Sequence, residues 1–257
     1  MKLVLSVGLK GGVGKTTVAV GVALALSRAG KKVGLLDLDY RTPNVLEALN
    51  GGTPILTQTF MGDILIPPEI RGIKVFSMSF IWPEGKSVMV RDEDAMQDVL
   101  NLLTPGVLAW GDMDYLVVDT PPTSTGVVQV ALDAVGVAGA MMVTHASTFA
   151  RADTLRTIDL FREKGVPVLG MVCNQVGLHD LGEHDMQAVA VRFGLPFFVA
   201  VPHCSQPAAL LPFFDQIAHL VETVTPVQLQ PEEIRSEAWT KLLSLTQTLS
   251  ESPRPGS

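Results

Sequence analysis

One short string, KGGVGKT at residues 10–16, constrains the fold of this chain more than any other feature. An apolar, β-branched run at residues 3–8 precedes it, and a helical pattern at residues 15–29 follows it and ends at Gly30. Glycines allow successive backbone N–H groups to converge on an anion, and a helix N-terminus behind them adds favourable partial charge. The order of strand, glycine-rich loop and helix therefore predicts a phosphate-binding loop.

The residue types in this loop each fit a nucleotide phosphate site. Lys15 can reach the β- and γ-phosphates, Thr16 can offer its hydroxyl to Mg²⁺, and Thr17 can contact the α-phosphate. The remaining phosphate contacts would come from the backbone of Gly11, Gly12, Val13 and Gly14. The string thus predicts a site for a nucleotide and Mg²⁺.

Strand and helix signals alternate along the chain. Apolar residues make up 47% of the 257 and charged residues 18%, which suits strands that are buried on both faces. Strands are predicted at residues 32–38, 73–77, 114–119, 139–144, 166–173 and 197–201, and helices at residues 92–103, 126–135, 150–164, 185–193 and 213–224. Residues 51–72 predict a long loop with short structured pieces. This alternation of predicted strands and helices predicts a doubly wound α/β fold with a mostly parallel sheet and helices on both faces.

The same pattern predicts one domain at residues 1–224, a linker and docked C-terminal helix at residues 225–250, and a flexible tail at residues 251–257. No segment approaches the roughly 18 apolar residues that a membrane span needs. The net charge of −7 disfavours nucleic-acid binding. Two cysteines, Cys173 and Cys204, fit a reducing compartment. We therefore expect a cytoplasmic protein that binds neither membrane nor nucleic acid.

Carboxylates are expected at two further strand ends. Asp37 and Asp39 lie at the end of the strand at residues 32–38, and Asp119 ends the strand at residues 114–119. Ligands of open parallel sheets gather at the carboxyl ends of the strands. We therefore expect the three carboxylates to lie beside the phosphate loop, with Asp119 holding Mg²⁺ through water.

The phosphate loop departs from the ordinary Walker A pattern. Leu9 stands where that pattern has glycine, and a second lysine, Lys10, opens the motif. This resembles the deviant Walker A of the MinD/ParA/Mrp class of ATPases, in which that lysine reaches the partner subunit's nucleotide in a sandwich homodimer. The resemblance implies ATP hydrolysis in a homodimer, with Lys10, Lys15, Asp37 and Asp39 as catalytic residues.

Further site residues are implied by the same resemblance. Thr16, Asp39 and Asp119 match the metal site of the class, although which of the two aspartates after the second strand holds the metal is open. Asn174 matches the asparagine that reads the adenine edge, and Pro202 would lie near the same base. No guanine signature is present, so ATP and ADP are favoured over guanine nucleotides.

Three longer segments resemble the Mrp/ApbC branch of this class, and the resemblance extends over roughly residues 2–223. Members of that branch carry iron–sulfur clusters, or related metal cargo, to target apoproteins. The resemblance implies a slow, dimer- or partner-stimulated ATPase in metal or iron–sulfur assembly or delivery, with a client or activator protein. A ParA/MinD-type positioning or partitioning ATPase is the alternative, binding a large cargo, DNA or membrane. The segments are GIKVFSMSF (72–80), WGDMDYLVVDTPP (110–122) and VPVLGMV (166–172).

The sequence lacks the Cys-x-x-Cys pair with which the family's carriers hold their cluster, so a bound iron–sulfur cluster is doubtful. At that place the chain has HDLGEHD, residues 179–185. This segment is either a site for a harder metal such as Zn²⁺, Fe²⁺ or Ni²⁺, or a solvated polar loop leading into a helix. Cys204 is either a ligand at a dimer interface or a small structural residue, and His145 is either a switch residue or a structural one. The candidate metal ligands are His179, Asp180, Glu183 and His184.

Overall fold

The computed structural model describes residues 1–50, 59–61, 64–80, 92–103, 106–122, 126–133, 137–179 and 181–229. Residues 230–257, which include the predicted C-terminal helix and tail, and Asp180 lie outside these residues. None of the helices in the described ranges is long and apolar enough to cross a membrane.

An eight-stranded sheet forms the centre of the fold, in the order β10-β9-β8-β1-β7-β2-β6-β5. All neighbouring strands pair in parallel except β5 and β6, which are antiparallel. The predicted doubly wound, mostly parallel α/β architecture is confirmed. The strands of this sheet are β1 (Lys2–Val7), β2 (Val33–Asp37), β5 (Glu69–Ile70), β6 (Ile73–Ser77), β7 (Tyr115–Asp119), β8 (Val137–His145), β9 (Val168–Val176) and β10 (Phe198–Pro202).

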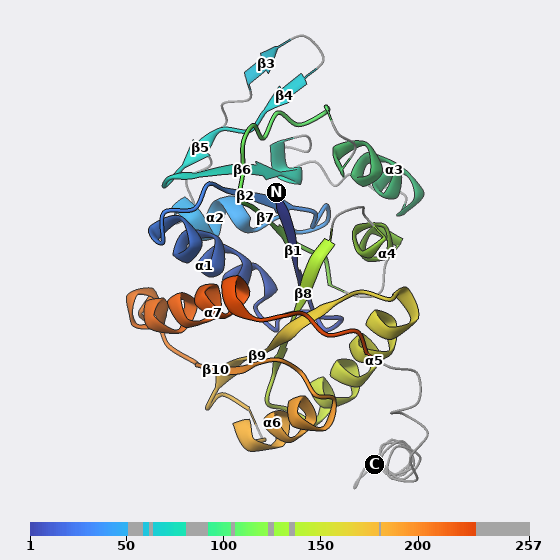
Figure 1. The fold of residues 1–257 in the computed structure, drawn as a ribbon, viewed down its shortest axis with the longest axis vertical. Helices are drawn as coiled ribbons and strands as arrows, with labels where there is room; N and C mark the ends of the chain where they lie inside the picture. The colour runs from blue at the N-terminus through green and yellow to red at the C-terminus, as the bar shows by residue number, and fades with distance from the viewer. Residues whose placement is uncertain are drawn as a thin grey trace, which may run out of the picture.

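Helices cover both faces of the sheet, with α1 and α7 on one side and α3, α4 and α5 on the other (Figure 1). Helix α1 packs closely on α7, because a Cβ added at Gly21 would lie 2.5 Å from the ring of Phe214. The predicted helices that lie within the described residues form with small shifts at their ends. The helices are α1 (Lys15–Arg28), α2 (Val45–Asn50), α3 (Asp92–Leu103), α4 (Gly126–Leu132), α5 (Thr148–Lys164), α6 (Glu183–Arg192) and α7 (Leu211–Thr223), with 3₁₀ turns η1 (Met78–Phe80) and η2 (Pro207–Leu210).

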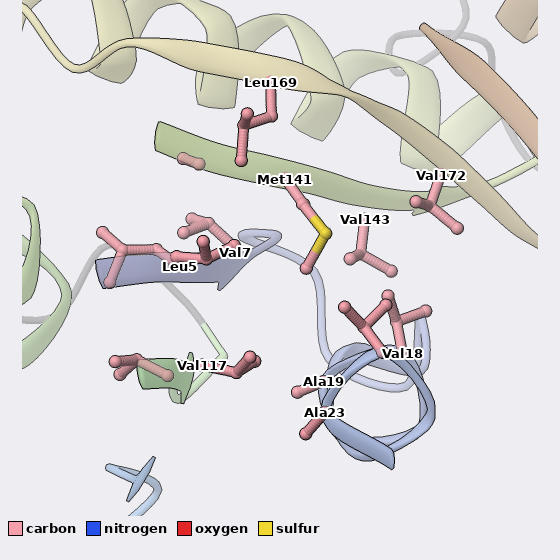
Figure 2. Close-up of a cluster of buried hydrophobic side chains, with 14 of the residues drawn as sticks. Leu5, Val7, Val18, Ala19, Ala23, Val117, Met141, Val143, Leu169 and Val172 are labelled. Carbon is pink, nitrogen blue, oxygen red and sulfur yellow. The ribbon is translucent and has the colours of Figure 1, made fainter. Parts of the chain in front are cut away.

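Small apolar side chains bring α1 close to the central strands. Val18, Ala19 and Ala23 of α1 are completely buried, and they face a cluster from the sheet that includes Leu5 of β1 and Met141 of β8 (Figure 2). Close packing of this kind leaves little freedom to the helix. The loop between β1 and α1 is therefore anchored at both of its ends.

The parallel register brings four polar strand ends to one level. Ser6 on β1 pairs with Asp119 on β7, Asp119 pairs with Asp37 on β2, and Asp37 pairs with Ser77 on β6. All four residues are buried. The carboxylates therefore lie at the same sheet edge as the loop that follows β1, as the sequence predicted.

The segment between β2 and β6 contains elements that the sequence did not locate. Helix α2 follows β2, and β3 (Thr59–Met61) pairs antiparallel with β4 (Ile64–Ile66) in a separate small sheet. Residues 51–58 and 62–63 of the predicted loop lie outside the described residues. The three strands missed here have only two or three residues, and α2 has six, which is less than two helical turns; such segments are too short to show a periodic apolar pattern.

Candidate nucleotide-binding site

Glycine is required at two positions of the loop between β1 and α1. Gly12 and Gly14 have left-handed φ angles of 79° and 86°, a region that residues with a Cβ rarely enter. At Gly14 there is also no space, since a Cβ would lie 2.0 Å from Asn174 Nδ2. Helix α1 begins at Lys15 without a side-chain cap. The N–H groups of its first turn are therefore available to a bound anion.

A cavity of about 520 Å³ opens at this loop, a volume within the usual range for small-molecule sites. The loop forms part of its wall through Gly12 and residues 14–17. The rest comes from Asp39 and the segment that leads from it into α2, from residues directly after β7, and from Gln175 on β9. Phosphate-loop residues and strand-end residues thus converge on one cavity.

Thr16 and Asp119 form the part of the site that fits a divalent cation. Thr16 Oγ1 donates a 2.5 Å hydrogen bond to Asp119 Oδ2, while Asp119 Oδ1 is buried and has no hydrogen-bond partner among the residues described by the structure. Burial, together with the nearby carboxylate of Asp37, raises the pKa of Asp119 well above its usual value. A carboxylate oxygen left unsatisfied beside a hydroxyl is a suitable donor set for Mg²⁺, which prefers oxygen ligands.

The two aspartates after β2 lie in different environments. Asp39 lines the cavity, and its Oδ1 accepts hydrogen bonds from the backbone N–H groups of Arg41 and Thr42 at 3.1 and 3.0 Å. Asp37 is completely buried and accepts hydrogen bonds from the Asp39 N–H at 3.0 Å and Ser77 Oγ at 2.8 Å. Burial raises the pKa of Asp37 to about 7. Asp39 therefore faces the cavity. Asp37 instead stabilises the loop that contains Asp39, by accepting the hydrogen bond from the Asp39 N–H.

Lys15 is the buried cation of the site. Its Nζ donates to the carbonyl oxygen of Lys10 at 3.2 Å. Burial lowers the pKa of Lys15, and the carboxylates of Asp119 and Asp39 oppose this effect. Lys15 also lines the cavity, so a phosphate group bound there would further stabilise its charged form.

The side chain of Lys10 lies over an exposed aromatic ring. Lys10 Nζ is 5.7 Å from the ring centroid of Phe149, which lies in the first turn of α5 and is 78% exposed. The distance fits a cation–π contact. The described residues that line the cavity do not include Lys10.

Asn174 and Gln175, at the end of β9, both contact the phosphate loop. Asn174 is buried, and its Nδ2 donates to the carbonyl oxygen of Val13 at 3.0 Å. Gln175 Nε2 donates to the carbonyl oxygen of Gly12 at 3.1 Å. Pro202 is half-buried at the end of the neighbouring strand β10. The contacts of Asn174 and Pro202 with adenine stay predictions.

The candidate metal ligands after β9 do not form a metal-binding group in the described part of the chain, where no three His, Cys, Asp or Glu side chains could hold a metal ion together. The position of Asp180 and the side chain of Glu183 lie outside that part, and their contribution stays a prediction. The ring of His179 instead stacks on the ring of His145, with centroids 3.9 Å apart. His179 Nε2 also lies 3.2 Å from Gln175 Oε1.

The two cysteines are free thiols in different surroundings. Cys173 is completely buried within β9, whereas Cys204, which follows β10, is partly exposed. Cys204 Sγ accepts a hydrogen bond from the backbone N–H of Gln206 at 3.4 Å. Cys204 is therefore the thiol that solvent or a partner can reach in this structure.

Seven lining residues were not predicted from the sequence, and three of these are Ala48 of α2 and Thr120 and Pro122 after β7. Thr42, Asn44 and Glu47 reach the cavity from the segment after Asp39, and Gln175 reaches it from the end of β9. The polar run RTPN at residues 41–44, which begins two residues after Asp39, was the signal for the first group. Gln175 carried no such signal, because its contact depends on a local change in the course of β9.

A glycine loop between a strand and a helix, a buried lysine in that loop and a threonine bonded to a strand-end aspartate together define a P-loop NTPase. The fold is the doubly wound one of that class. The chain belongs to the NUBPL iron-transfer P-loop NTPase family, whose ParA model matches residues 1–206.

Individual relatives agree with this assignment. An iron–sulfur cluster carrier protein from Pseudomonas fragi is 35% identical over an alignment of 207 residues, and the match covers 75% of this chain and 70% of that protein. A protein of the same name from Deinococcus radiodurans is 41% identical over 166 residues, which are 64% of this chain and 46% of its own length. The chain spans about half the length of several of the carriers that it matches.

The fold also resembles that of a nucleotide-binding protein from Archaeoglobus fulgidus that was solved in complex with ADP. The two chains share 25% sequence identity with a TM-score of 0.63, and the match covers 89% of this chain and 93% of that one.

Proposed function

We propose that this protein binds and hydrolyses ATP as a homodimer and acts in the assembly or delivery of iron–sulfur clusters or related metal cargo. The observation that carries the proposal is the Thr16–Asp119 pair beside buried Lys15, in a chain of the iron-transfer family. The ADP complex of the Archaeoglobus protein supports the choice of an adenine nucleotide.

The phosphate loop would bind the triphosphate through its backbone N–H groups and Lys15, with Thr17 at the α-phosphate. Mg²⁺, held by Thr16, Asp39 and Asp119, would neutralise charge on the phosphate oxygens. Asp39 faces the cavity and would orient the attacking water as well as the metal, while Asp37 keeps Asp39 in place through the Asp39 N–H. Water within the cavity then attacks the γ-phosphate, and ADP and phosphate are released.

Lys10 would act on the partner subunit's nucleotide. Its side chain lies outside the described lining of its own cavity and against exposed Phe149. A cation supplied by a second subunit stabilises the charge that develops on the transferred phosphoryl group. ATP binding would then close the homodimer through its nucleotide face, and Asn174 and Pro202 would contact the adenine.

The cargo site is where this chain departs from the family's carriers. The sequence has two cysteines and no Cys-x-x-Cys pair, and Cys173 is buried. A dimer would therefore present two accessible thiols, one Cys204 from each subunit, whereas iron–sulfur clusters are usually held by four protein ligands. We propose that Cys204 and His179 are candidate cargo ligands and that both subunits of the dimer contribute them.

Two measurements test the proposal. Purified protein should hydrolyse ATP slowly in the presence of Mg²⁺, and Lys15→Ala should abolish hydrolysis. Equal turnover by this variant would contradict the assignment.

Protein reconstituted anaerobically with iron and sulfide, in the presence of ATP, should retain metal, and Cys204→Ala and His179→Ala should lower its metal content. His219→Ala, on the exposed side of α7, serves as the matched histidine control. Metal at background level in the wild type would contradict the proposal that this protein carries metal cargo. The proposed function would then be reduced to that of an ATP-driven dimer switch.

A further inference from the structure

The end of β9 contains a β-bulge that changes the direction of two adjacent side chains. Cys173 pairs with Ala200 of β10, and the next pair joins Val176 to Pro202. Three steps on β9 therefore match two steps on β10, which leaves one extra residue on β9. Within this stretch Gln175 has a left-handed φ of 57°. Bulges of this kind occur beside functional sites, where they redirect a side chain.

Because of the bulge, consecutive carboxamides reach the same loop. In a regular strand adjacent side chains point to opposite faces. Here Asn174 Nδ2 donates to the Val13 carbonyl at 3.0 Å, and Gln175 Nε2 donates to the Gly12 carbonyl at 3.1 Å. The two amides thus hold two successive carbonyl groups of the phosphate loop.

Holding these carbonyls fixes the direction of two N–H groups. A trans peptide is planar, and its N–H points opposite to its C=O. The Gly12 carbonyl belongs to the same peptide as the Val13 N–H, and the Val13 carbonyl belongs to the same peptide as the Gly14 N–H. Anchoring both carbonyls on the β9 side therefore directs both N–H groups away from β9. In a phosphate loop these N–H groups are donors to the nucleotide.

The other end of Gln175 contacts a histidine pair. Since Nε2 of Gln175 donates to a carbonyl, its Oε1 faces His179 Nε2 at 3.2 Å and accepts a hydrogen bond from it. The ring of His179 stacks on the ring of buried His145, at the end of β8. A continuous chain of contacts therefore leads from the Gly12 carbonyl, through Gln175, to the segment that joins β9 to α6.

We propose that Gln175 is a positioning residue that directs the Val13 N–H toward the phosphates and transmits occupancy of the phosphate site to His179. An anion on the Val13 N–H polarises that peptide and makes the Gly12 carbonyl a stronger acceptor. The effect passes along the chain, because linked hydrogen bonds strengthen one another. The result is a shorter, stronger bond from His179 to Gln175 whenever nucleotide is bound. This inference rests on the nucleotide binding of the proposed function, but neither on hydrolysis nor on cargo.

The experiment is a titration of full-length protein, labelled with ¹⁵N-histidine, with Mg·ADP. Calorimetry gives the dissociation constant, and the imidazole spectrum follows the His179 Nε2 resonance, which the variant His179→Phe identifies. Wild type should show a shift of this resonance on binding. Gln175→Leu should weaken Mg·ADP binding by about two- to tenfold, the range for loss of one net hydrogen bond, and should abolish the shift. Gln175→Glu keeps the acceptor for His179 but loses the donor to Gly12, and it should show the same two losses.

Two controls separate positioning from a general loss of structure. His179→Phe keeps the ring stack and the contact between Gln175 and Gly12, so its Mg·ADP affinity should stay within about twofold of wild type. Gln129→Leu makes the same substitution at an exposed position of α4 and should leave both the affinity and the His179 shift unchanged. Gln175→Leu or Gln175→Glu protein with wild-type affinity, or with a preserved shift, overturns the inference while leaving the proposed function intact. A wild-type protein that fails to bind Mg·ADP overturns both.

Discussion

The hydroxyl of Thr16 donates a 2.5 Å hydrogen bond to Asp119 Oδ2, and this bond links the first turn of α1 to the end of β7, 103 residues later in the chain. Both groups are ligands of the type that Mg²⁺ prefers. Their contact shows that the fold itself brings the two metal-binding groups together. The register that places Asp119 beside Ser6 at the end of β1 is the cause of this preorganisation.

The first prediction concerns the hydroxyl of Thr16. Thr16→Ala should lower the Mg²⁺ affinity of the nucleotide complex by about 10–100-fold, as expected when a group that holds or orients the metal is lost. Thr16→Ser keeps the hydroxyl and should stay close to wild type. The measurement is ATP turnover as a function of Mg²⁺ concentration. Identical Mg²⁺ curves for Thr16→Ala and wild type would show that this hydroxyl does not serve the metal.

The second prediction concerns the pH dependence of stability without nucleotide or Mg²⁺. The pKa of Asp37 in the folded protein is about 7, above its ordinary value of 3.8. Between these values the folded state keeps a proton that the unfolded state has released. The free energy of unfolding should therefore fall as the pH rises from about 4 to about 7, by at most about 4 kcal/mol, and then level off. Asp119, whose pKa is raised for the same reason, contributes with the same sign.

The variant Asp37→Asn isolates the contribution of Asp37. An amide does not ionise, so the fall in stability between pH 4 and pH 7 should be smaller in this variant than in wild type. Urea unfolding at several pH values measures both curves. Parallel curves for the two proteins would contradict the prediction, because the slope would then come from other groups.

Much of the fold and of the phosphate site could be predicted from the sequence. The string at residues 10–16 fixes the order of strand, loop and helix, because few other sequences place so many glycines beside a lysine and a threonine there. The apolar runs of the central strands, such as β7 with all five residues buried, were equally clear. Asp37, Asp39 and Asp119 were placed at the correct sheet edge because parallel strands end at the same side.

The remaining features depend on tertiary contacts that no local pattern encodes. The different environments of Asp37 and Asp39 follow from a hydrogen bond between Asp37 and Ser77, two residues on neighbouring strands but 40 positions apart. Gln175 reaches the phosphate loop through a bulge, which adds one residue without altering the apolar pattern of β9. The stacking of His179 on His145 likewise joins the segment after β9 to the end of β8.

The third prediction uses two glycines with similar backbone angles. Gly14 and Gly30 have φ angles of 86° and 83°. A Cβ at Gly30 would meet open space, whereas one at Gly14 would lie 2.0 Å from Asn174 Nδ2. Gly30→Ala should therefore cost about 1–2 kcal/mol from backbone strain alone. Gly14→Ala should cost about 1–3 kcal/mol more from overpacking, and should abolish nucleotide binding.

Chemical unfolding and nucleotide calorimetry on both variants measure these effects. Equal losses of stability in Gly14→Ala and Gly30→Ala would mean that the loop and Asn174 can move apart without cost. Retained nucleotide binding in Gly14→Ala would contradict the requirement for glycine at this position.

The last prediction concerns Lys10 and Phe149, whose side chains lie 5.7 Å apart, measured from Nζ to the ring centroid. If Lys10 acts on the nucleotide of the partner subunit, Lys10→Ala should lower kcat, by on the order of 10³-fold for a cation supplied by another subunit. Its affinity for Mg·ADP should change little, because Lys10 is outside the described lining of its own cavity. An equal loss in affinity and kcat would place Lys10 at the nucleotide of its own chain.

Phe149 should influence catalysis through Lys10. Phe149→Leu removes the aromatic face but keeps an apolar side chain, and loss of an exposed cation–π contact of about 0.5–1 kcal/mol corresponds to a change in kcat of about two- to fivefold. Phe149→Tyr keeps the aromatic face and should retain wild-type kcat. In a Lys10→Ala background, Phe149→Leu should have no further effect on kcat, because the cation that the ring holds is gone. A full additional loss in that double variant would show that exposed Phe149 contributes to turnover by a route independent of Lys10, such as direct contact between subunits.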